Sequence, residues 1–237
     1  MATDANGFDT RVDAHPTAAD AALGPRFIQE ASAYAANWNN GASSIAVTFS
    51  QPVAQGNLIA IYVTYATQGG SYLNTTDAQN DTFMPVDTAS DGGQQQAATS
   101  VYAANVAGGT VTVTVQFNGS PCCRVVVAHE IAGVSTIDAH SSNHQSSVGT
   151  SADAVNAGTI TTNHPDYVFA GTSDPSNANS QAITAGSVET LRANSAPTGD
   201  NQTMTEDLMQ STSGAVSSKF TFSKSAPALS LQMAFQP

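Results

Sequence analysis

Several segments of the chain alternate apolar and polar residues. The clearest examples are residues 45–49, 111–117 and 229–235. Successive side chains of a β-strand point to opposite faces, so each segment has one apolar face and one polar face. Sheets of this kind bury their apolar faces against one another. The pattern therefore predicts an all-β fold, a two-sheet antiparallel β-sandwich.

The spacing of turn residues predicts about ten to twelve short strands. Glycine pairs and Asn-Gly steps, such as Gly108-Gly109 and Asn118-Gly119, separate the apolar segments. Residues 58–65 are almost continuously apolar, which predicts a central strand covered on both faces. This number of strands indicates a sandwich of jelly-roll-like size. No long helix and no internal repeat is visible, and residues 205–209 are expected to form a short helical turn.

The chain divides into an arm and one body. Residues 1–25 lack strand periodicity and are interpreted as an irregular N-terminal arm. Residues 26–237 are interpreted as a single β-sandwich domain, because nothing in them resembles a linker. An unpatterned arm can add a strand to the sheet edge of a neighbouring copy, so self-assembly is one function that it favours.

The composition and charge of the chain disfavour some classes of binding partner. Only 10% of the residues are charged, and the net charge is −12 with a pI near 4.3. So acidic a chain repels phosphate backbones and anionic lipid surfaces, which disfavours nucleic acid as a partner. No segment has the roughly 20 apolar residues needed to insert into a membrane. An uncharged polar surface is typical of extracellular β proteins, so we expect an extracellular or cell-surface location, although no signal peptide is visible at the N-terminus.

The two cysteines, Cys122 and Cys123, are adjacent. Their Cα atoms lie about 3.8 Å apart across a trans peptide, below the usual disulfide range of about 4.4–6.8 Å. This geometry favours two buried or unreactive thiols. A vicinal disulfide and an intermolecular bridge stay open as alternatives.

The order of strand signatures resembles an uncharacterised family of bacterial secreted or surface β-sandwich modules, often found beside fibronectin-type or immunoglobulin-like repeats. The signatures are Ile28-Gln29, Gly56-Asn57-Leu58-Ile59, Asp77 and Asn80 before Phe83, Val101-Tyr102-Ala103-Ala104, Glu130-Ile131-Ala132-Gly133-Val134 and Met233-Ala234-Phe235. The resemblance implies a jelly-roll-like extracellular module for adhesion, glycan contact or surface architecture. The family usually reads Asp-x-x-Gly-Asn before its aromatic, whereas residues 77–81 lack that glycine.

One acidic loop has the residue types of a calcium site. Asp77, Asn80 and Asp81 lie close together and offer the carboxylate and amide oxygens that Ca²⁺ prefers. Asp and Asn are also common in tight turns, where their side chains bond to the local backbone. The loop is therefore either a Ca²⁺ site or an ordinary turn, and no other cofactor is expected.

A second group has the residue types of a transition-metal site. Asp138, His140 and His144 are close in sequence, but the polar residues between the histidines favour a solvated loop. His129 and Glu130 are consecutive on a predicted strand, so they are expected to face opposite ways and not to act on one substrate atom. Glu130 is expected to pair with Arg124 or to cap a loop.

Few aromatic residues are available to stack on sugar rings. Trp38, the single tryptophan, lies in an Asn-rich segment and is the leading glycan-contact candidate, with Tyr72 and Asn74 as weaker ones. No Gly-x-Ser-x-Gly motif is present. Four acidic residues are available for a catalytic carboxylate pair, which sequence alone does not bring together: Glu130, Glu189, Glu206 and Asp207.

These observations favour a non-enzymatic extracellular structural or adhesion module, which assembles with other copies or with surface proteins. A self-assembling surface or filament subunit that uses the N-terminal arm is the most specific form of this hypothesis. The alternative is a carbohydrate-binding module with a Ca²⁺-steadied loop. A glycan-cleaving enzyme on a sandwich scaffold is a third class, since fold alone does not decide function.

Overall fold

Every regular element in the described part of the chain is a β-strand, and every strand pair is antiparallel. The computed structural model describes residues 24–35, 42–176, 181–195 and 202–237. The prediction of an all-β antiparallel sandwich is confirmed, while the jelly-roll assignment stays a prediction. The strands are β1 (Arg26–Ala35), β2 (Ser44–Thr48), β3 (Leu58–Ala66), β4 (Gly70–Thr76), β5 (Met84–Asp91), β6 (Gln96–Ala103), β7 (Thr112–Gly119), β8 (Arg124–Ala132), β9 (Thr136–Val148), β10 (Val155–Asn156), β11 (Ile160–Thr162), β12 (Tyr167–Asp174), β13 (Ile183–Ala185), β14 (Thr190–Ser195), β15 (Gln202–Met209), β16 (Gly214–Val216), β17 (Lys219–Phe222) and β18 (Ala226–Gln236).

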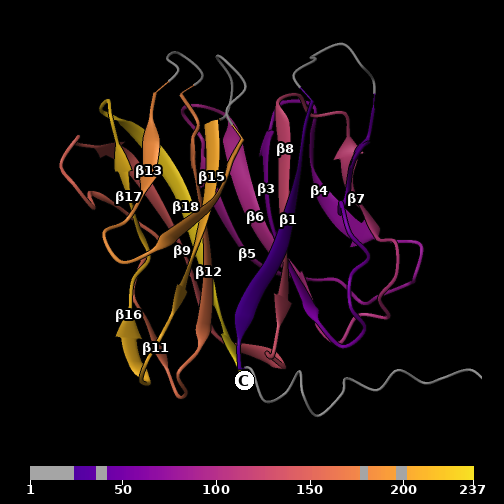
Figure 1. The fold of residues 1–237 in the computed structure, drawn as a ribbon. Coiled ribbons are helices and arrows are strands. Elements are labelled where there is room, and N and C mark those ends of the chain that lie inside the picture. Colours follow the sequence, from indigo (N-terminus) through magenta and orange to yellow (C-terminus); the bar gives the residue numbers. More distant parts are fainter. Residues whose placement is uncertain (1–23, 36–41, 177–180, 196–201) are drawn as a thin grey trace, which may run out of the picture.

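The sheets are stacked in four layers, where the sequence suggested two (Figure 1). Two five-stranded sheets form the inner layers, with strand orders β1-β8-β3-β6-β5 and β14-β15-β12-β18-β9. The sheet β2-β7-β4 covers the outer face of the first, and the sheets β10-β17-β13 and β11-β16 cover the outer face of the second. Two sandwiches therefore pack face to face.

The central strand β3 shows why the layers stack in this way. Ile59, Ile61 and Val63 pack toward the outer sheet β2-β7-β4. Leu58, Ala60 and Tyr62 alternate with them and pack toward the second inner sheet. The expectation that residues 58–65 form a strand covered on both faces is confirmed, because every residue of β3 is buried.

The strand order of the first half, residues 26–132, recurs in the second half, residues 136–236. The first half has the orders β1-β8-β3-β6-β5 and β2-β7-β4. Counting from β9, the second half has β9-β18-β12-β15-β14 and β10-β17-β13, which is the same arrangement with β11 and β16 as an added pair. The sequence shows no matching repeat, so only the topology is duplicated.

The duplication extends to irregularities in the strands. In β1 the residue Ile28 is an extra residue between two positions paired with β8. In β9 the residue Asp138 is extra in the same way, opposite β18. The bulges align the two halves residue by residue, so that Leu58 of β3 corresponds to Tyr167 of β12. Four residues farther along, Tyr62 corresponds to Gly171.

The two halves meet through the faces of the inner sheets. At the centre, the Tyr62 ring packs on Gly171, and its hydroxyl donates to the Leu229 carbonyl oxygen at 2.7 Å. The edge strand β5 lies against β9, and the edge strand β1 lies against β14. The contact is therefore nearly two-fold symmetric, with β3 facing β12 near the axis.

Two local expectations are corrected by the structure. Cys122 and Cys123 form a vicinal disulfide, so they are not the free thiols that the geometry favoured. Glu206 and Asp207 lie buried in strand β15 and not in a helical turn, because a strand on either side pairs with them. The N-terminal arm lies outside the described residues up to residue 23. Within the described part, no helix is long and apolar enough to cross a membrane.

Candidate functional site

The loop between β4 and β5 carries three side-chain oxygens that are buried and have no hydrogen-bond partner. They are Asp77 Oδ2, Gln79 Oε1 and Asp81 Oδ2. The other polar atoms of the same side chains hold the loop in place. Asp81 N donates to Asp77 Oδ1 at 3.0 Å, and Gln79 Nε2 donates to the Thr110 carbonyl oxygen at 2.8 Å. Ala107 N donates to Asp81 Oδ1 at 2.9 Å. The loop is thus fixed while one oxygen of each side chain stays unsatisfied.

The structure brings together both aspartates of the predicted calcium set. Burial, together with the neighbouring Asp77 carboxyl, raises the pKa of Asp81. Asn80 is exposed and has a φ of 62°, a left-handed conformation that Asn adopts more readily than most residues. Its backbone shapes the turn, and its role as a ligand stays a prediction. Sequence reasoning missed Gln79, because an amide within a turn has no distinctive signal.

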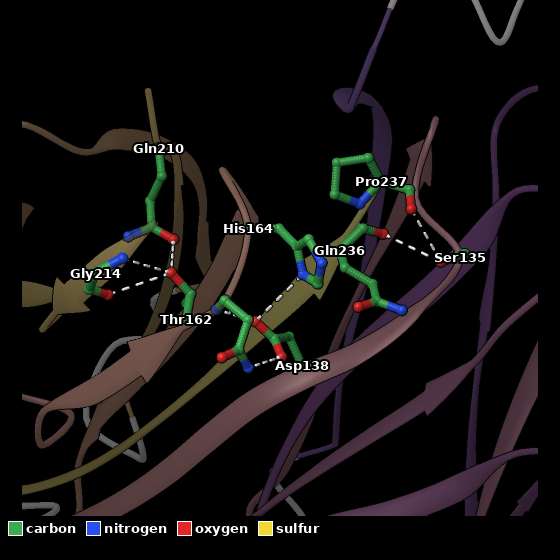
Figure 2. A network of polar contacts seen from close by, with 9 residues as sticks. Ser135, Asp138, Thr162, His164, Gln210, Gly214, Gln236 and Pro237 are labelled. Carbon is green, nitrogen blue, oxygen red and sulfur yellow. Dashed lines mark hydrogen bonds and ion pairs between the residues drawn. The ribbon is translucent and has the colours of Figure 1, made fainter. Parts of the chain in front are cut away.

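A second cluster lies at the start of β9 and in the loop between β11 and β12. One ligand atom each of Asp138, His164 and Asp166 lies within 4.8 Å of the other two. The His164 ring faces the Asp138 carboxylate, with 3.8 Å between Nδ1 and Oδ2 (Figure 2). Asp138 occupies the bulge of β9, which directs its side chain toward this loop. Twenty-six residues separate Asp138 from His164, so sequence spacing could not reveal the cluster.

Backbone and amide groups hold the second cluster. Asn163 donates to Asp138 through its backbone N at 2.6 Å and its Nδ2 at 2.8 Å, and these two bonds lower the pKa of Asp138. Gln210 N donates to the Asp166 carbonyl oxygen at 2.9 Å. The Asp166 side chain is fully buried, and neither of its carboxylate oxygens has a hydrogen-bond partner. Burial, followed by the Asp138 charge, raises the pKa of Asp166 to about 6.

The histidines of the predicted transition-metal group do not join Asp138. His140 and His144 lie on strand β9 and not in a solvated loop. Their side chains cross to the neighbouring strand β5, where His140 Nδ1 lies 2.6 Å from Asp87 Oδ2 and His144 Nε2 lies 3.0 Å from Asp91 Oδ2. Four strand residues span about 13 Å, too far for both rings to bind one metal. They instead pair the two halves of the molecule along this edge.

Glu130 has the structural role that its strand position suggested. Its Oε1 accepts from Ala54 N at 2.8 Å and from Asn57 Nδ2 at 2.5 Å, and its Oε2 accepts from Gln29 Nε2 at 2.6 Å. It therefore caps the loop before β3 and does not pair with Arg124. His129 points to the opposite face, as expected, where its ring packs edge-on against Phe27 and Phe169.

We expect Glu130→Gln to lower the free energy of unfolding by about 2 kcal/mol. The substitution keeps the shape of the side chain but replaces one accepting oxygen by a donor, and it removes the charge that strengthens the remaining bonds. Urea unfolding followed by circular dichroism measures the change. An unchanged midpoint would contradict the assigned capping role.

Two of the three glycan-contact candidates, Tyr72 and Asn74, lie in the described residues, on strand β4. Tyr72 is half-buried against the core of the first half, and its hydroxyl lies 3.0 Å from Thr75 Oγ1. Asn74 is exposed on β4. Trp38 lies outside the described residues. Contact of these three residues with a glycan stays a prediction.

Two of the acidic residues considered for a catalytic pair, Glu189 and Glu206, lie close to one another beside Gly186, whereas Asp207 and Glu130 have separate partners. Glu206 Oε2 accepts from Gly186 N at 3.1 Å, while its Oε1 is buried without a partner. Burial, followed by the Glu189 charge, raises the pKa of Glu206 to about 9. Asp207 faces the other side of β15, where Arg192 Nε lies 2.7 Å from its Oδ2 and the Tyr167 hydroxyl donates to the same oxygen.

Comparison with known proteins identified no related protein. No family model matches the chain, and no curated protein and no solved structure is significantly similar to it.

Proposed function

We propose that the chain is a non-enzymatic extracellular module whose β4–β5 loop binds Ca²⁺ and which serves adhesion or surface architecture. The observation that carries this proposal is the set of three unpartnered oxygens of Asp77, Gln79 and Asp81. Buried polar atoms are almost always hydrogen-bonded, so three exceptions in one five-residue loop call for a partner. A hard cation that accepts carboxylate and amide oxygens fits them.

The alternating positions of the ligands support the same partner. Residues 77, 79 and 81 are spaced two apart, as are the first ligands of calcium-binding loops that wrap around the ion. Water and backbone carbonyls would complete the six to eight oxygens that Ca²⁺ takes. With only two carboxylates, the affinity is expected in the range of extracellular modules, with a Kd of about 10⁻⁴–10⁻³ M.

The body around the loop suits a module that holds a partner. Four stacked layers fix the loops on a rigid frame, and few of the polar surface groups are charged. Gly56 N donates to the Val106 carbonyl oxygen at 2.9 Å, and the neighbouring Asn57 bonds to Glu130 near the end of β8. Ala107, which follows Val106, donates to Asp81, so the β4–β5 loop also lies toward the end of β8. Asp138 follows at the start of β9. Both acidic clusters thus lie at the same end of the molecule, which we take as the partner-binding end.

We expect Ca²⁺ to raise the melting temperature of the chelator-treated protein and Asp81→Asn to abolish the increase. At a Ca²⁺ concentration 100 times the Kd, binding adds about 2.7 kcal/mol to the free energy of unfolding. Asp87→Asn is the matched control, because it removes the same charge from a residue of β5 outside the loop. Dynamic light scattering of the same samples measures self-association with and without Ca²⁺.

An equal Ca²⁺ response of Asp81→Asn and the wild type would overturn the calcium assignment. Hydrolysis of a polysaccharide by the purified protein would overturn the non-enzymatic assignment. The glycan-binding alternative is tested on a glycan array. Binding by the wild type that is lost in Trp38→Ala would show that the module binds glycans and not other proteins.

A further inference from the structure

The cluster of Asp138, His164 and Asp166 is not required by the fold of this end of the molecule. The first half has the same strand order and the same bulge, and Ile28 occupies the position of Asp138. Asn57 stands directly before β3, as Asp166 stands directly before β12, and the Asn57 amide is bonded to Glu130. At the equivalent positions the first half therefore has the apolar residue Ile28 and the hydrogen-bonded amide of Asn57.

The second half instead buries a carboxyl group that no hydrogen-bond donor of another residue type reaches. Asp166 has no exposed surface, and both of its side-chain oxygens lack a hydrogen-bond partner. Asp138 brings a second carboxylate to the same place. Taking a carboxylate out of water without a partner destabilises the fold, and a nearby like charge adds to the destabilisation. Asp138 already accepts two hydrogen bonds from Asn163, so a bound cation would chiefly satisfy Asp166, for which the metal-free protein offers only a proton shared with Asp138.

The donor atoms select the kind of cation. Two carboxylate oxygens and one imidazole nitrogen are a donor set that zinc accepts, whereas calcium takes six to eight oxygens. In a tetrahedral zinc site with bonds of about 2.1 Å, neighbouring ligand atoms lie about 3.4 Å apart. His164 Nδ1 and Asp138 Oδ2 are 3.8 Å apart, and all three ligand atoms lie within 4.8 Å, so small side-chain movements complete the geometry.

We propose that Asp138, His164 and Asp166 form a zinc site, in which water occupies the fourth position. The site is held from outside by Asn163, whose two donors fix the Asp138 carboxylate, and by Gln210, which fixes the backbone at Asp166. Such supporting bonds orient ligands in metal sites. The His164 side chain is half exposed, which leaves a route by which an ion can reach the site.

Titration calorimetry of the chelator-treated full chain with ZnCl₂ tests the site. We expect one zinc ion to bind per chain. His164→Ala and Asp166→Asn are each expected to weaken zinc binding by about 100-fold, because loss of a ligand costs at least as much as loss of a residue that only supports a ligand. The matched control is His140→Ala, which removes a partly exposed histidine two residues from Asp138 and is expected to bind zinc like the wild type. Equal binding by all four proteins, or loss of binding in the control alone, would overturn the proposal.

The melting temperature without metal separates a zinc ligand from a structural carboxyl. A ligand held unpartnered for an absent ion destabilises the metal-free fold, so Asp166→Asn is expected to raise the melting temperature of the metal-free protein and to remove its increase on adding zinc. A structural role predicts a lower melting temperature and an intact zinc response, and this result would refute the proposal. Gln79→Leu is expected to leave zinc binding unchanged, so failure of the calcium loop and failure of the zinc site are distinguishable.

Discussion

Glu206→Gln stabilises the protein at neutral and alkaline pH, by up to about 3 kcal/mol at pH 7. Burial raises the pKa of Glu206 to about 9, well above its value in the unfolded chain. Between about pH 4.5 and pH 9 the folded protein therefore retains a proton that the unfolded chain has released. The free energy of unfolding falls with rising pH across that window, and the variant lacks the group that causes the fall.

Urea unfolding at pH 5, 7 and 9 measures this effect. The wild type is expected to lose stability steadily over the series, and Glu206→Gln is expected to lose much less. Glu130→Gln provides the control, because Glu130 is equally buried but fully hydrogen-bonded, so its substitution destabilises the protein. Parallel pH profiles of the wild type and Glu206→Gln would show that Glu206 is not held protonated in the fold.

Gly171→Ala destabilises the protein by about 3 kcal/mol. A Cβ at this position would lie 2.4 Å from Cδ2 and 2.5 Å from Cγ of the Tyr62 ring. The ring cannot move away easily, because it is buried and its hydroxyl is bonded to the Leu229 carbonyl oxygen. The two inner sheets must then separate where β3 faces β12, and the contact between the halves loosens.

Thermal and urea unfolding measure the cost, and Gly92→Ala is the control, since a Cβ there would meet no heavy atom within 4 Å. In a Tyr62→Leu background, the cost of Gly171→Ala is expected to shrink, because the colliding ring is gone. Equal costs in both backgrounds would show that the glycine is not selected by the Tyr62 contact.

Much of the fold follows from local pattern. The alternation of residues 45–49, 111–117 and 229–235 predicted β2, β7 and the end of β18, and the apolar run of β3 predicted burial on both faces. The number of layers could not be predicted in the same way. Strand β15 carries Glu206 and Asp207, an acidic pair that is normally exposed, and only the neighbouring strands and the outer sheet bury it. The neighbouring strands β12 and β18 of the same sheet also bury polar side chains, such as Thr172 and Ser230, whose Oγ1 and Oγ atoms lie 2.8 Å apart.

The two candidate metal sites also differ in how far the sequence alone could predict them. The aspartates of the β4–β5 loop are only four residues apart, so their chemistry was visible from the residues alone. The second cluster joins residues far apart, and sequence proximity instead suggested His140 and His144 as partners of Asp138. The bulge at Asp138 changes which face the following residues occupy, so the histidines pair with β5 while Asp138 meets the β11–β12 loop.

Titration calorimetry with Ca²⁺, comparing the wild type with Gln79→Leu, tests the central claim most directly. The substitution leaves the net charge of −12 unchanged, so it separates coordination from general attraction of cations to an acidic protein. Gln94→Leu, in the exposed turn after β5, is the matched control. We predict one saturable Ca²⁺ site in the wild type and in Gln94→Leu. In Gln79→Leu we predict a Ca²⁺ affinity at least about 10-fold weaker, which is the smaller loss seen when a residue that supports a metal site is changed. No saturable binding in the wild type, or equal binding by all three proteins, would contradict the account.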